Sequence, residues 1–199
     1  MIELKAYQGL IRNHADLAKQ LDLDLSQRSR REREEAIVVA AYQKWGDEMG
    51  LHINGQFGIV LFDTETEELF CTRDVLGAEL LFYYQTEDGR LLTALQIRDL
   101  FDQPGFKRQL NEELIQFYLG FSYIPGEETL FKGVYKLEPG GTLRFGKKGL
   151  TLGRFWEKGP QKRLYIPAPL LREGENQLLI LETEGRSGEV WLHDEPDLV

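Results

Sequence analysis

The spacing of apolar residues changes along this chain of 199 residues, and it predicts helices first and strands afterwards. Within residues 13–25, three leucines recur at every fourth position, which places them on one face of a short helix. They are Leu17, Leu21 and Leu25. A second helix is predicted over residues 30–47. Ser29 and Glu32 have the spacing of a capping box at its start, and an apolar run follows them.

After residue 54 the helical pattern ends, and β-branched and aromatic residues become frequent. The segments of this kind are GQFGIVLFD, ELFCTR and LLFYY. Asp88-Gly89 is a hairpin signal between LLFYYQ and RLLTAL. Together these segments predict an antiparallel meander.

Helical patterns return at residues 97–102 and 111–119, where we expect Asn111 to be the N-cap and Gly120 the C-terminal stop. From Lys136 onward, short strand-like segments alternate with turns rich in glycine and proline. This spacing indicates either a small all-β module or an additional sheet. The segments are TLRF, LTLGRFW, RLYIP, QLLILETEG and EVWLHDEP.

Composition limits the classes of partner. Hydrophobic residues make up 42% and charged residues 29%, which is typical of a folded globular protein. The net charge is -9, and the basic run RSRRER leads directly into two glutamates, so we expect no nucleic acid or membrane partner. No stretch approaches the roughly 18 apolar residues of a membrane helix, and there is no signal-peptide pattern. We therefore expect a cytoplasmic protein.

Cys71 is the only cysteine, so no internal disulfide can form. A reactive thiol needs an electropositive, partly exposed site, and Arg73 is the only cation close to it in sequence. We interpret Cys71 as a packing residue of a strand. The three histidines stand at no metal-ligand spacing, and the common phosphate-binding, dinucleotide-binding and hydrolase motifs are missing. The residues alone predict no catalytic centre, no metal and no cofactor.

Five longer motifs occur between Tyr7 and Phe145: AYQKWG, NGQFGIVLFD, LFCTRDVLG, DGRLLTALQIRDLF and YLGFSYIPGEETLFKGVYKLEPGG. In these motifs the chain resembles the amidotransferase domain of glutamine-hydrolysing asparagine synthetases, which is of the class II, N-terminal-nucleophile type. The resemblance implies a layered α-β-β-α architecture and glutamine as the substrate. It also implies that ammonia passes to a separate ATP-using synthetase domain.

The positions that carry chemistry in that family differ here. The family nucleophile is a cysteine at the start of the mature chain whose own α-amine acts as general base. This sequence starts with Met1-Ile2, and its Leu95-Gln96 replaces the family's serine-glutamate pair. The family's opening strands, with their arginine-glycine-proline-aspartate loop, are not matched by any segment.

Three residues fall at the family's oxyanion and substrate positions. Gln8 and Gly9 align with an asparagine and a glycine whose amides form the oxyanion hole. Glu34 falls near the aspartate that holds the substrate amine. The extra methylene of Gln8 would displace its amide by about an ångström, which weakens oxyanion stabilisation. We interpret these three positions as vestigial and predict no catalytic residue.

The segment KGLTLGRFWEKGPQKRLYIPAPLLREGENQLLILETEG starts at Lys148 and is followed by HDEPDL. It resembles the C-terminal jelly-roll region of family 35 β-galactosidases, whose catalytic glutamates lie in a separate barrel. We expect its aromatic residues to pack in a core or to make weak sugar contacts. The aromatic residues in question are Trp156, Tyr165 and Trp191.

The predicted fold is α+β: a truncated N-terminal-nucleophile sheet framework over residues 1–148, with a short jelly-roll-like β extension over residues 149–199. The function predicted first is that of a pseudoenzyme, a chimera of the two segments, that acts as a structural or interaction module. Alternatives are a glutaminase component completed by a synthetase-type partner, and a carbohydrate-binding module. Glutamine is a ligand only if the site is retained. The missing opening strands should leave a sheet edge open to self-association unless the C-terminal strands cover it.

Overall fold

The computed structural model describes residues 1–124 and 126–156. The compact unit to which they belong runs from Met1 to Glu157. The jelly-roll-like extension, Tyr165 and Trp191 therefore lie outside the described residues. In chain order the elements are β1 Ile2–Ile11, α1 His14–Gln20, α2 Arg30–Trp45, η1 Gly46–Glu48, α3 Met49–His52, β2 Gly55–Asp63, β3 Glu68–Arg73, β4 Phe82–Gln85, β5 Leu91–Ala94, η2 Ile97–Leu100, α4 Glu112–Phe121, β6 Val134–Lys136, β7 Gly141–Gly146 and β8 Gly149–Arg154.

The larger sheet is antiparallel and has five strands in the order β1-β2-β3-β7-β8. Strand β1 was not predicted from the apolar pattern. Its register on β2 shifts between Leu4 and Ala6, so Lys5 forms a bulge and the side-chain alternation changes phase there. A strand with such a shift shows no continuous period of two.

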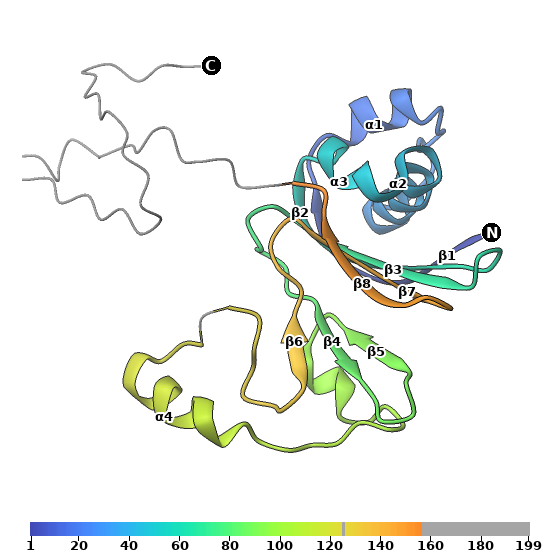
Figure 1. Cartoon of the computed structure of the whole chain (residues 1–199). Coiled ribbons are helices and arrows are strands. Elements are labelled where there is room, and N and C mark those ends of the chain that lie inside the picture. Colours follow the sequence, from blue (N-terminus) through green and yellow to red (C-terminus); the bar gives the residue numbers. More distant parts are fainter. Residues whose placement is uncertain (125, 157–199) are drawn as a thin grey trace, which may run out of the picture. The chain divides into compact units, whose positions relative to one another are not determined.

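Helices α1, α2 and α3 lie on one face of this sheet (Figure 1). The capping box is confirmed, because Ser29 Oγ accepts from the Glu32 N–H at 3.4 Å and the Glu32 carboxylate accepts from the Ser29 N–H at 2.8 Å. The buried face of α2 packs on the aromatic and branched residues of the sheet. Full burial of a large aliphatic side chain such as isoleucine or valine stabilises a fold by about 1.5–3 kcal/mol. The residues of α2 in this layer are Ile37, Val38, Ala41 and Tyr42.

The opposite face of the sheet packs on a second antiparallel sheet of three strands, ordered β5-β4-β6. The single meander predicted over residues 55–94 is wrong, because the chain leaves the first sheet after β3. Cys71 lies between the two sheets, together with Leu81 and Tyr83 from the second sheet. Beyond the second sheet, η2 contributes the fully buried Leu100. The α+β class with antiparallel layers is confirmed.

The turn between the sheets is fixed by two buried charged residues, Arg73 and Asp74. The Arg73 guanidinium donates to three backbone carbonyls, those of Gly77, Glu79 and Leu137. The Asp74 carboxylate accepts from four backbone N–H groups, which belong to Phe57, Leu76, Ala78 and Glu79. These hydrogen bonds pair backbone groups that have no strand partner where the chain passes from the first sheet to the second.

Helix α4 differs from the prediction at its end. It continues through Gly120 to Phe121 and ends at Ser122, which adopts a left-handed conformation with φ 59°. Asn111 occupies the N-cap position without a side-chain capping bond. None of the residues of α4 is buried. None of the described helices is long and apolar enough to cross a membrane.

The first sheet continues beyond the predicted boundary at residue 148. Strand β8 pairs with β7 along its whole length, and Phe155 packs against the cluster under the helices. Residues 149–155 therefore belong with the first unit, while the assignment of the later residues to a separate segment stays a prediction. Among the described strands, β1 and β8 form the two edges of this sheet.

Candidate functional site

A cavity of about 400 Å³ brings together the three residues that the sequence placed at site positions. Strand β1 supplies Tyr7, Gln8 and Gly9, and the first turns of α2 supply Glu34. Two further residues of α2, Arg30 and Arg31, complete the lining and were not predicted.

Gly9 lets β1 approach its neighbour closely at this cavity. Its φ is +148°, and a Cβ built there would overlap the backbone carbonyl of Gln56 on β2. No other residue fits this position without displacing backbone. The alternation of the strand then turns Tyr7 inward, where it is 8% exposed, and turns Gln8 outward.

Glu34 is the most deeply buried charged residue of the cavity, with 3% exposure. Its carboxylate accepts from the Tyr7 hydroxyl at 3.0 Å, the Arg30 Nε at 3.1 Å and the Ile11 N–H at 3.3 Å. His14 Nε2 lies 3.2 Å from it. Burial raises the pKa of Glu34, but the hydrogen bonds from Arg30, Ile11 and Tyr7 together outweigh burial and lower it. The carboxylate is thus held in place by hydrogen bonds from the protein itself.

Gln8 is also engaged by the protein. Its side-chain Nε2 donates to the Glu79 carboxylate at 2.7 Å, and the Gln56 amide donates to the same carboxylate at 3.5 Å. An oxyanion hole needs a free donor aimed at the developing charge. In the described structure one N–H of the Gln8 amide donates to a carboxylate instead, which directs this side chain toward Glu79.

The two residues that replace the family's serine-glutamate pair make ordinary contacts. Leu95 packs against the cluster between the sheets, close to Gly58 of β2. The Gln96 side chain accepts a hydrogen bond from Arg98. Neither side chain lines the cavity.

Cys71 is fully buried and belongs to the cluster between the sheets, whereas Tyr7 belongs to the cluster under the helices. Burial in apolar surroundings raises the pKa of the Cys71 thiol far above its ordinary value. The thiol therefore stays protonated at neutral pH and is a poor nucleophile. The interpretation of Cys71 as a packing residue is confirmed.

Trp156 is 39% exposed, and its side chain lies against Gly140 in the turn before β7. It is not among the residues that line the cavity. Within the described ranges, no group of three or more histidine, cysteine, aspartate or glutamate residues is placed to hold a metal ion.

Arg30 carried a signal in the sequence that was missed. It stands four residues before Glu34 on the predicted helix, which is the spacing of an ion pair. His14 and Tyr7 carried no such signal, because they reach Glu34 only through the packing of β1 and α1 against α2.

The family model described as "Glutamine amidotransferase domain" matches residues 3–156, which include both sheets and the cavity. The chain belongs to this family. A second model, described as "Beta-galactosidase, galactose-binding domain", matches the short stretch 148–176.

Curated relatives of this amidotransferase-family chain include asparagine synthetase [glutamine-hydrolyzing] 3 of Bacillus subtilis, which is 30% identical over 78% of the chain. A putative asparagine synthetase [glutamine-hydrolyzing] of Mycobacterium bovis is 31% identical over 67% of the chain. The chain spans 25% and 21% of these two relatives. The solved structure of the allosteric regulatory enzyme of purine biosynthesis has the same fold, with a TM-score of 0.50. The two proteins are 15% identical, and the match covers 79% of this chain and 29% of the enzyme's chain.

Proposed function

We propose that this amidotransferase-family domain does not hydrolyse glutamine by itself and serves as a structural or interaction module in the cytoplasm. The state of the cavity carries the proposal. The Gln8 amide donates to Glu79, and the Glu34 carboxylate already accepts from Tyr7, Ile11 and Arg30. The hydroxyl of Tyr7 donates to Glu34, and burial raises the pKa of Tyr7. Within the described part of the chain, no thiol lines this cavity.

An assay of glutamine turnover tests the proposal. The purified full chain is incubated with glutamine, and the release of ammonia and of glutamate is measured separately. The expected rate equals that of buffer, both for the wild-type chain and for Gln8→Ala. Release above buffer that Gln8→Ala abolishes contradicts the proposal, because it shows a working oxyanion site at this cavity.

A second candidate is the glutaminase component of an asparagine synthetase completed by another chain. Two observations favour it: Gln8, Gly9 and Glu34 lie on one cavity, and the relatives named as asparagine synthetases are several times longer than this chain. This candidate predicts glutamine hydrolysis only when an ATP-using synthetase protein is added. A chain that stays inactive and does not co-purify with such a protein rules the candidate out.

A third candidate is a carbohydrate-binding module, favoured by the match of residues 148–176 to a galactose-binding domain model. Titration with galactose, followed by tryptophan fluorescence, tests it. A saturable change that Trp156→Phe removes supports the candidate, and a flat response at millimolar sugar rejects it.

A further inference from the structure

Strand β1 is an edge of the first sheet among the described strands, so part of its backbone has no neighbouring strand. The N–H of Ile11 points away from β2, because it donates to the Glu34 carboxylate of α2. Backbone groups alternate in direction along an antiparallel strand, so the N–H and C=O groups of Tyr7 and Gly9 point to the same side as those of Ile11. No described residue forms a hydrogen bond with these groups of Tyr7 and Gly9. This side of β1 is therefore an open row of backbone donors and acceptors.

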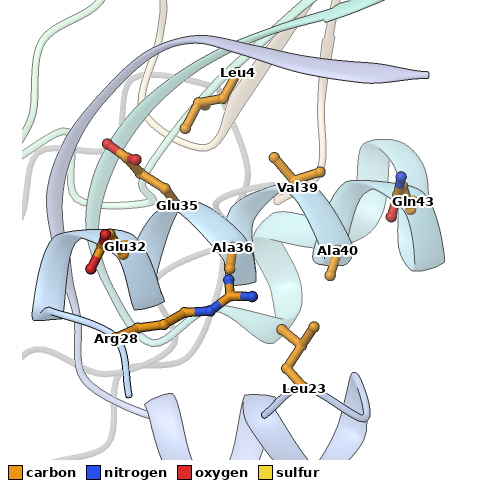
Figure 2. A pocket seen from close by; sticks show the side chains of 9 residues that line it. All are labelled: Leu4, Leu23, Arg28, Glu32, Glu35, Ala36, Val39, Ala40 and Gln43. Atoms are coloured by element: carbon orange, nitrogen blue, oxygen red, sulfur yellow. The ribbon is translucent and has the colours of Figure 1, made fainter. Parts of the chain in front are cut away.

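Two cavities follow this open side of β1, and helix α2 lines both of them. The cavity of the candidate site reaches β1 at residues 7–9. The other cavity has a volume of about 590 Å³ and reaches β1 at Leu4. Figure 2 shows Leu4 on the side of α2 that carries Glu35 and Val39. Together the two cavities extend along β1 over residues 4–9.

The two cavities differ in the side chains that they can accept. The cavity at Leu4 is lined mainly by apolar residues, and its alanines leave room for large aliphatic side chains. These apolar residues are Leu4, Leu23, Ala36, Val39 and Ala40. Charges of both signs surround them, from Arg28, Glu32 and Glu35. The cavity at Tyr7 is lined by Arg30, Arg31 and Glu34, which favour polar groups. A ligand that fills both cavities therefore has aliphatic groups at one end and polar groups at the other.

We propose that β1 binds an extended segment of a partner protein as an additional antiparallel strand. The open groups of Tyr7 and Gly9 stand two residues apart, so they repeat at about 6.6–6.8 Å, which the backbone of another strand matches. All described strand pairs of the first sheet are antiparallel, which favours this direction. The bulge at Lys5 twists the edge and opposes pairing with the long β1 of a second copy. The inference rests on the proposed role as an interaction module, and it names the class of partner.

Binding of a labelled synthetic peptide to the full chain tests the inference. The probe is a blocked peptide of serine and threonine with leucines at alternate positions of its C-terminal half, which lies beside Leu4 in an antiparallel pairing. One control peptide carries N-methyl groups on the alternate amides that would donate to β1, and a second carries them on the amides that point away. In the chain, Ala40→Glu places a charge in the apolar cavity. Leu76→Glu is the matched control, because Leu76 is 86% exposed and lines neither cavity. Circular dichroism checks that each variant is folded, and Ala40→Lys replaces Ala40→Glu if that variant is not.

Fluorescence anisotropy is expected to show saturable binding of the probe and of the peptide methylated on the amides that point away. Methylation of the amides that face β1 should weaken binding about tenfold or more, because backbone hydrogen bonds are lost. Ala40→Glu should also weaken binding of the probe, and Leu76→Glu should not. Absence of saturable binding, equal binding of the two methylated peptides, or equal binding by the two chain variants overturns the proposal. A chain that sediments as a dimer and binds no probe also overturns it, because a second copy then occupies the edge. Glutamine turnover is measured separately, so this inference can fail without deciding whether the domain hydrolyses glutamine.

Discussion

Removing the Glu34 carboxylate should destabilise the domain through two buried donors. In Glu34→Ala, the Tyr7 hydroxyl and the Ile11 N–H lose their acceptor. Each buried group left without a partner costs about 1–3 kcal/mol, so the free energy of unfolding should fall by about 2–6 kcal/mol. Arg30 adds little to this loss, because its side chain is 59% exposed and can return to water.

Urea unfolding followed by tryptophan fluorescence measures the change, since Trp45 lies at the end of α2. The control is Glu35→Ala on the same helix, which removes only the exposed pair with Arg31 and should cost about 0.3–0.5 kcal/mol. A loss in Glu34→Ala no larger than in Glu35→Ala would refute the reasoning that the Glu34 carboxylate is held by buried donors.

The same carboxylate predicts a pH dependence. The pKa of Glu34 is lowered in the folded state, so its charge stabilises the fold above the ordinary glutamate pKa of about 4.3. That contribution is lost as the pH falls through the lower folded-state pKa. The difference in unfolding free energy between the wild-type chain and Glu34→Gln should therefore narrow on acidification. If the difference in unfolding free energy between the two chains stays constant as the pH falls below the pKa of Glu34, the charge of Glu34 contributes nothing to stability.

Three further predictions concern backbone and thiol. Gly120→Ala should stabilise the fold by ~0.5–1 kcal/mol, because its new Cβ meets no neighbouring atom. Gly9→Ala should destabilise the fold by several times that amount, because its new Cβ overlaps the backbone of β2. Thermal unfolding of the two variants checks both effects. Cys71 should react with a thiol reagent only after unfolding, and rapid native-state labelling would contradict its burial. Arg73→Lys should lower the melting temperature markedly, because one ammonium cannot reach three separated carbonyls; an unchanged temperature would contradict this.

Local signals in the sequence identified the elements whose cause is local. The capping box of Ser29 and Glu32 and the apolar face of α2 follow from residues near one another in the chain. Strand β1 was missed because the bulge at Lys5 breaks its alternation. The split of the expected meander into two sheets was missed because it depends on Arg73 and Asp74, whose partners lie up to 64 residues away.

The positions of the candidate site could be predicted from the sequence, but most of their contacts could not. The resemblance to the asparagine synthetase domain placed Gln8, Gly9 and Glu34 at site positions, and the structure brings all three to one cavity. The sequence could not show that Glu79 binds Gln8, because the two are 71 residues apart and no pattern links them. The contacts of Glu34 with Tyr7 and His14 were equally invisible, because these partners come from other elements, whereas the i,i+4 spacing of Arg30 was a signal that was missed.

We propose that this chain keeps an amidotransferase framework whose buried Cys71 thiol does not attack an amide. Intact-mass spectrometry after incubation of the native chain with a glutamine-mimicking electrophile tests this most directly. We expect an unmodified mass for the native chain, with Cys71 labelled only in the unfolded chain. A covalent adduct on any residue of the native chain that excess glutamine prevents would contradict it.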